Sequence, residues 1–269
     1  MKLERKIVGL VGALSWLSIF LPASITFAQA PRQTSSALKK PLLYQIGEMV
    51  HINAGGPRPL LQAVDALQQK YGWVVDYEDP RYLPAADAAN RTSPPNRRRA
   101  NIGPGENGFS VQFNVGPTPD SRPDEGTVLT TVIDAYNESG GEAEFKALKQ
   151  PGAGFAVVGV GVRDTTGEIA SQQPVLDLSI NLASERRSAE QTIALICHEL
   201  SQTSKVPVAV DPASGNLHKK ASVVVGGSSV PARTLLSRTL VSLGGKLCWR
   251  LLYDAAGNSY ALSIQELSR

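Results

Sequence analysis

The segment "CHELS", from Cys197 to Ser201, contains the residues whose types best suit catalysis. His198 followed by Glu199 matches the start of the zinc-protease helix motif. That motif needs a second His one turn later, so that two imidazoles on one helical face bind one ion, but position 202 is Gln. We interpret the pair as an ordinary surface His-Glu pair. A small hydrolase, metal-dependent through His198 and with a site between the two halves of the chain, stays the alternative.

Other motifs that mark enzymes are missing from the sequence. It contains no Gly-x-Ser-x-Gly nucleophile elbow. The glycines of "NIGPGENG" and "VVGVGV" lack the strand-to-helix context of a nucleotide-binding loop, and those of "VVGVGV" indicate a bulge or close backbone packing within a strand. The carboxylates are scattered, so no pair is assigned to acid–base work. We predict a non-catalytic protein with no cofactor and no metal.

The two cysteines, Cys197 and Cys248, define a candidate disulfide. Cys197 lies on the expected buried side of a helix, and Cys248 lies in a strand that follows the next helix. Whether they meet depends on the direction of Cys248. If Leu247 and Trp249 face the helices, Cys248 points away from them and no bridge forms.

A basic segment interrupts the first half of the chain between residues 81 and 108. It is rich in Pro, Ala and Asn, has no apolar period, and contains Arg91, Arg97, Arg98 and Arg99. The corresponding connection in the second half is shorter and carries Lys219 and Lys220. A loop of this length is usually functional or disordered. We expect either a solvated loop or a contact with an anionic lipid or cell-wall polymer.

The elements that position these residues follow one order in both halves. Apolar residues with steps of four, three and four predict amphipathic helices at 59–71 and 188–203. Second helices are expected at 127–139, with Thr127 as N-cap, and at 231–243. Ser188 and Gln191 form a capping box, and glycines 140 and 244 end the second helices in left-handed backbone. Short apolar strands flank each helix, and a hairpin closes each half.

Each half therefore reads β-α-β-β-α-β-β, which predicts an α+β fold of two tandem repeats with helices packed on small mixed sheets. The repeats span residues 41–168 and 169–269. The likeness between "ESGGEAEFKAL" at 138–148 and "SLGGKLCWRLL" at 242–252 agrees with this interpretation, because both occupy the end of a second helix and the strand that leaves it.

The beginning of the chain has the pattern of a secretory signal peptide over residues 1–30. A basic start is followed by an apolar run and by small residues near Ala28 and Ala30, where cleavage is expected. A polar tether follows at 31–40. Removing three bases and one acid lowers the formal charge from +3 to about +1, which argues against nucleic acid as a partner. The mature protein is expected in the periplasm or outside the cell.

The unit resembles the secretin and TonB short N-terminal domain. The segment "PLLQAVDALQQKYGWVVDYEDP" is similar to the first part of that family, and "VVVGGSSVPARTLLSRTLVSLGGKLCWRLL" is similar to its second part. The resemblance implies a periplasmic module that binds other proteins through strand edges or helix faces. The family's members usually precede a barrel or a secretin ring. No such domain follows in this sequence, so receptor signalling and secretin assembly are in doubt. We expect a scaffolding or binding role with an envelope protein of unknown identity.

Overall fold

The computed structural model describes residues 42–82, 108–116, 122–150, 154–164, 166–212, 221–244 and 246–267. All of them belong to one compact unit, residues 38–269. The predicted signal peptide and tether lie outside the described residues.

Among the described residues, the first half supplies two helices and six strands. The three-residue strand β7, just past the predicted boundary at 168, pairs with the last of these strands. In chain order they are β1 (Leu42–Ile46), β2 (Met49–Ala54), α1 (Pro59–Tyr71), β3 (Val75–Glu78), β4 (Phe109–Asn114), α3 (Glu125–Glu138), β5 (Ala143–Lys149), β6 (Phe155–Arg163) and β7 (Ile169–Ser171).

The second half begins with a short 3-10 helix and repeats most of this order. Its elements are η1 (Val175–Asp177), β8 (Ser179–Ser188), α4 (Ala189–Ser204), β9 (Val208–Val210), β10 (Ser222–Pro231), α5 (Ala232–Leu243), β11 (Leu247–Asp254) and β12 (Ser259–Glu266). The predicted α+β class is confirmed.

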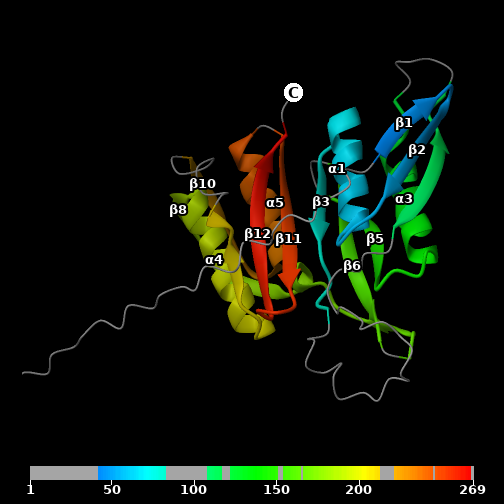
Figure 1. Ribbon diagram of the computed structural model, residues 1–269. Coiled ribbons are helices and arrows are strands. Elements are labelled where there is room, and N and C mark those ends of the chain that lie inside the picture. The colour runs from blue at the N-terminus through cyan, green and yellow to red at the C-terminus, as the bar shows by residue number, and fades with distance from the viewer. Residues whose placement is uncertain are drawn as a thin grey trace, which may run out of the picture. The chain divides into compact units, whose positions relative to one another are not determined.

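A single seven-stranded sheet runs through both halves. Its order is β5-β6-β3-β11-β12-β9, and β7 pairs with β6 beside this path. The halves join where β3 lies parallel to β11, with Arg250 opposite Tyr77 and Leu251 opposite Glu78 (Figure 1). The residues on either side of the predicted boundary at 168 thus contribute to one shared sheet.

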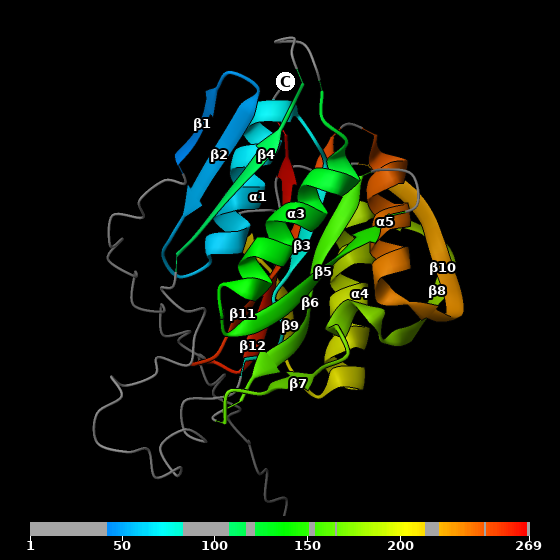
Figure 2. The ribbon, with the colours of Figure 1, turned by 90° about the vertical axis from the view of Figure 1, so that its right-hand side faces the viewer.

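Two smaller sheets cover the helices. β1-β2-β4 forms one, and β8-β10 forms the other. Helix α1 contacts β2 and β3, and α3 contacts β4 and β5, so this pair lies between the smaller sheet and the large one. Helices α4 and α5 lie in the same way between β8-β10 and the large sheet (Figure 2).

The two helix pairs cover opposite faces of the large sheet. The ring of Tyr77 stacks on Phe145, whose ring contacts Tyr136 of α3. The next residue, Glu78, binds Arg233 of α5. Successive residues of a strand point to opposite faces, so α3 and α5 lie on opposite sides of β3.

Strand directions require this arrangement. Each half has the same order, β5-β6-β3 or β11-β12-β9, with an antiparallel pair followed by a parallel pair. Because β3 is parallel to β11, the strands of the second half run opposite to their counterparts in the first. A rotation of 180° about an axis that lies in the plane of the sheet, perpendicular to the strands, relates the strands of the first half to those of the second. The same rotation carries the helices from one face of the sheet to the other.

The helix ends test the sequence predictions closely. The helix at 59–71 is confirmed, and α4 begins at Ala189 with the expected capping box of Ser188 and Gln191. Helix α3 starts two residues earlier than predicted, because Asp124, not Thr127, is the N-cap and accepts from the Thr127 N–H. Gly140 and Gly244 both have the expected positive φ, at 77° and 69°.

The glycines of "VVGVGV" lie in β6, where close packing was predicted. A Cβ on Gly159 would lie 2.4 Å from the Cδ of Pro80, and the pairing of β5 with β6 is shifted beside it, between Glu144 and Phe145. Gly159 therefore lets the chain after β3 cross directly over β6.

Among the described residues, no helix combines the length and the apolar character needed to cross a membrane.

Candidate functional site

Three acidic residues at the end of β3 are the most unusual feature of the interior. All three are buried: Asp76 and Glu78 lie in β3, the strand at which the two halves join, and Asp79 directly follows it. Burying a carboxylate costs several kcal/mol unless it is paired and hydrogen-bonded. Each of the three therefore needs a specific partner, and each finds one in the second half.

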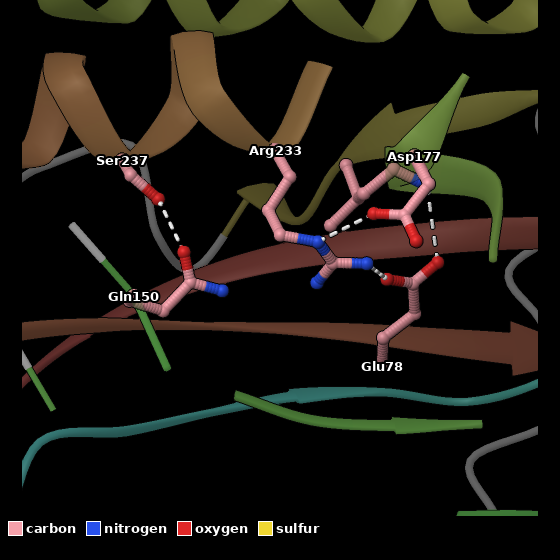
Figure 3. Close-up of polar contacts among 6 residues, drawn as sticks. Glu78, Gln150, Asp177, Arg233 and Ser237 are labelled. Carbon is pink, nitrogen blue, oxygen red and sulfur yellow. Dashed lines mark hydrogen bonds and ion pairs between the residues drawn. The ribbon is translucent and has the colours of Figure 1, made fainter. Parts of the chain in front are cut away.

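Glu78 is held by an arginine from α5 (Figure 3). Its Oε2 accepts a hydrogen bond from Nη2 of Arg233 at 2.6 Å, and its Oε1 accepts one from the N–H of Leu176 at 3.1 Å. Arg233 also donates from Nε to Asp177 at 2.8 Å, and its guanidinium lies 5.5 Å from the ring centre of Trp249. One cation thus binds two carboxylates and covers an aromatic ring.

The same close-up shows a second polar contact on α5. Ser237, one turn after Arg233, donates to the side-chain oxygen of Gln150 at 3.2 Å (Figure 3). Gln150 follows β5, so this contact also connects the two halves.

Asp79 and Asp76 contact the backbone of β11. Asp79 accepts from Nε of Arg58 at 2.8 Å and from the N–H of Tyr253 at 3.0 Å, while Arg58 also donates to the carbonyl of Tyr253. Asp76 accepts from the N–H of Trp249 at 2.9 Å. These contacts fix the register of β11 against β3.

Burial sets the protonation of these acids. It raises the pKa of Asp76 to about 7, against the opposing effects of the Trp249 N–H, Arg233 and Arg250. It also raises the pKa of Glu78 and of Asp79, against their arginine partners Arg233 and Arg58. Asp76 is the member of the group without a direct ion pair among the described residues. It is therefore the member of this group whose protonation changes near neutral pH.

On the other face of β11, Arg250 binds helix α1. It donates from Nη2 to Gln68 at 2.6 Å, pairs with Asp65 at 2.5 Å, and donates from Nε to Gln265 at 3.0 Å. Gln68 in turn donates to the carbonyl of Val75. Helix α1 is thereby attached to a strand of the second half.

The candidate disulfide is not present. Cys197 and Cys248 are both buried free thiols. Trp249 faces Arg233 of α5, so Cys248 points to the opposite face, toward α1. Burial raises the pKa of Cys248, opposed by Arg250 and by a hydrogen bond with Gln68 of α1. Cys197 lies on α4, on the α5 side of the sheet, and the sheet separates the two sulfurs.

A cavity of about 570 Å³ opens beside the acid cluster, where both halves and their connection meet. Its lining comes from the chain after β3, from the segment around η1, from the end of α4 and from β12. Among the described residues of this lining, Arg81 is the cation, and Tyr82 and Tyr260 are the aromatic residues.

The outer face of the β1-β2-β4 sheet carries exposed apolar side chains. Ile46 is 64% exposed and Tyr44 is 37% exposed. The ring of Tyr44 stacks on His51 of β2 with centres 4.9 Å apart, and Ile46 lies opposite Met49. We call Tyr44, Ile46, Met49 and His51 the β1 face. Within the described residues, β1 pairs only with β2, and none of these residues pairs with its other edge.

The residues singled out in the sequence are not brought together. His198 is exposed on α4 and does not line the cavity. Among the described residues, no group of three or more His, Cys, Asp or Glu side chains could hold a metal ion. The basic residues Arg91, Arg97, Arg98, Arg99, Lys219 and Lys220 lie outside the described residues.

The residues that sequence reasoning missed had a visible signal. In "WVVDYEDP", a strand between two buried elements carries three acids within four positions. An apolar run broken in this way predicts buried ionic partners. The identity of the partners, Arg58 and Arg233, becomes apparent only in the folded structure.

Comparison with known proteins identifies no relative. The chain matches no model of a protein family, no curated protein and no solved structure.

Proposed function

We propose that this protein is an exported, non-catalytic module that binds another envelope protein by strand addition at β1. The free edge of β1 beside the β1 face is the observation that carries the proposal. An unpaired strand offers a row of N–H and C=O groups to an incoming chain, and alternate side chains provide specificity. The resemblance to the secretin and TonB short N-terminal domain is part of this proposal.

The geometry of β1 indicates the chemistry of the partner. Tyr44 and Ile46 are two residues apart and point to the same outer face, while Leu43 points toward the helices. An extended segment beside β1 would place alternate side chains next to Tyr44 and Ile46. The expected partner therefore presents a strand-forming segment with apolar residues at every second position.

The second half offers a natural control. Its smaller sheet has two strands, β8 and β10, and β10 carries Val224, which is 59% exposed. A charge at Val224 alters exposed apolar surface without touching β1.

The experiment compares envelope extracts captured on the mature chain and on two variants. We expect Tyr44→Lys with Ile46→Lys to lose a partner that the unchanged chain and Val224→Lys both retain. A photo-crosslinking residue at position 46 should link to that partner, and the same residue at position 224 should not. Equal capture by all three proteins would overturn the proposal, as would light scattering that shows β1-dependent pairing of two copies of this chain.

Export is a separate part of the proposal. It rests on the sequence pattern of residues 1–30 and on no contact in the fold. Fractionation of a Gram-negative host that expresses the full chain should place it in the periplasm. Mass spectrometry should find a mature N-terminus at Gln29 or Pro31, and an intact Met1 would contradict export with cleavage.

A further inference from the structure

We propose that the cavity between the two halves is a binding site for a small organic anion, with Arg81 holding the carboxylate. At about 570 Å³, the cavity has the size of ordinary small-molecule sites. It is separate from the β1 face, so the two proposals can fail independently.

The cation is held in place by its surroundings. The side chain of Gln172 accepts from the N–H of Arg81 at 3.1 Å and donates to its carbonyl at 3.0 Å. The guanidinium of Arg81 donates from Nη2 to Asn258 at 3.2 Å, and Asn258 also accepts from the hydroxyl of Tyr253. Asn258 lies in the β11–β12 turn with a positive φ of 44°. The backbone and the side chain of Arg81 are thus both positioned before any ligand binds.

The guanidinium keeps donors for a ligand. Arginine has five N–H donors in a planar fork, which matches a carboxylate in a bidentate geometry. Among the described residues, Arg81 forms one side-chain hydrogen bond and no ion pair. Arg81 is an exposed residue of the lining, so an incoming anion can reach the remaining donors.

The rest of the lining fits a compact apolar body with polar groups at its edge. Val175, Leu178, Val206 and the rings of Tyr82 and Tyr260 supply apolar surface. Thr203 and Ser204 add hydroxyl groups to the lining, and these donate to helix carbonyls at 2.9 and 2.7 Å. One cation beside aromatic and aliphatic walls favours a monoanion with an aromatic or branched body over a bare inorganic ion.

Phenylacetate is the probe, and the mature chain is the protein. Binding is followed by amide chemical shifts in two-dimensional NMR. We expect shifts concentrated at residues 81–82, 172–178, 203–206 and 260, and weaker binding of the neutral analogue phenylacetamide. Inorganic phosphate serves as the test for a site that needs only a negative charge.

Two variants and one control separate the site from general effects of charge. Arg81→Gln should weaken phenylacetate binding at least about tenfold, because a charge-assisted bidentate contact is lost. Gln173→Trp, at an exposed position of the lining, should block the cavity. Arg186→Gln removes an exposed arginine of β8 outside the cavity and should leave binding unchanged. Thermal unfolding checks that all three variants are folded.

Three results would overturn the proposal. The first is the absence of shifts in the cavity residues at millimolar phenylacetate. The second is equal affinity of the unchanged chain and Arg81→Gln. The third is binding of phosphate as tightly as phenylacetate, since the apolar walls would then contribute nothing.

Discussion

Arg233 compensates more buried charge than any other single described residue of this protein. It pairs with Glu78, which is fully buried, and with Asp177, and it also covers the ring of Trp249. Replacing such an ion pair as a whole can be nearly neutral, whereas removing one partner leaves an uncompensated charge. A single substitution of Arg233 should therefore destabilise the fold more than a double substitution that also removes the charge of Glu78.

Arg233→Met should lower the free energy of unfolding by about 3–5 kcal/mol at neutral pH. Urea unfolding followed by circular dichroism measures this loss. Arg238→Met, at an exposed position of the same helix, is the matched control and should change stability by less than about 0.5 kcal/mol. Combining Arg233→Met with Glu78→Gln should restore part of the loss. Equal effects of Arg233→Met and Arg238→Met would show that Glu78 needs no counter-charge.

Asp76 gives the protein a stability that depends on pH. Its pKa is raised from 3.8 to about 7 in the folded chain, so the fold binds a proton that the unfolded chain releases. The stabilising contribution is complete below about pH 4 and is lost as the pH rises to about 7. Arg233 of α5 and Arg250 of β11 lie close enough to Asp76 to oppose this rise of its pKa.

Asp76→Asn should remove this dependence, because an amide oxygen still accepts from the Trp249 N–H but does not titrate. Relative to the unchanged chain, the variant should gain stability between about pH 4 and pH 8, by up to about 4 kcal/mol. Urea unfolding at a series of pH values gives the difference. A constant difference between the two proteins across this range would show that Asp76 titrates normally in the fold.

At the scale of residues, the sequence predicts the place of a residue within its helix or turn better than it predicts which distant residue it contacts. Ser188, Gly140 and Gly244 could be assigned because a cap or a positive φ is a local requirement. The roles of Asp76, Glu78 and Asp79 are harder to predict, because each has a partner in the second half that lies 155 to 174 residues away along the chain. The direction of the Cys248 side chain cannot be predicted for the same reason, because it depends on which face of β11 meets α5.

At the scale of elements, β6 depends on glycine where the chain after β3 crosses it. Gly159→Ala would place a Cβ 2.4 Å from Pro80, and overpacking of this kind costs about 1–3 kcal/mol. Gly55→Ala is the control, since its nearest neighbour would lie 3.9 Å away. The midpoint of thermal unfolding should fall for Gly159→Ala and stay nearly unchanged for Gly55→Ala. Similar midpoints for both variants would show that Pro80 can move aside.

Helices whose apolar residues recur at a helical period could be predicted well from the sequence. Strands that depend on an irregular pairing with a distant strand could not. Both first helices lie where steps of four, three and four placed them. The residues of the segment "GGSSVP" are typical of a turn before a helix, but they belong to the ten-residue strand β10. The pairing of β10 with β8 is irregular between Val225 and Val230, which lets glycines and serines take part in a strand. Such irregular pairing leaves no periodic signal in the sequence.

At the scale of the whole folded unit, the two halves have the same strand order but do not form separate sheets. The duplication inferred from the sequence stays a prediction, and the equal orders β5-β6-β3 and β11-β12-β9 agree with it. The sequence could not show how the halves join, because β3 and β11 pair along an edge that each half would expose alone. The buried acids of β3 are placed at this junction, where they bind Trp249, Arg233 and Tyr253 of the second half.

The shared sheet predicts that the halves unfold together. Separating them would expose the edges of β3 and β11. It would also leave Glu78 without Arg233 and Asp76 without the Trp249 N–H, so an intermediate with one folded half is costly. A chain produced without residues 1–30 contains one tryptophan in each half, Trp73 and Trp249. Trp73→Phe and Trp249→Phe therefore give single-tryptophan proteins whose fluorescence reports on one half each. In each variant, the urea midpoint from fluorescence should coincide with its midpoint from circular dichroism. Two separated transitions in either variant would show that the halves are independent domains.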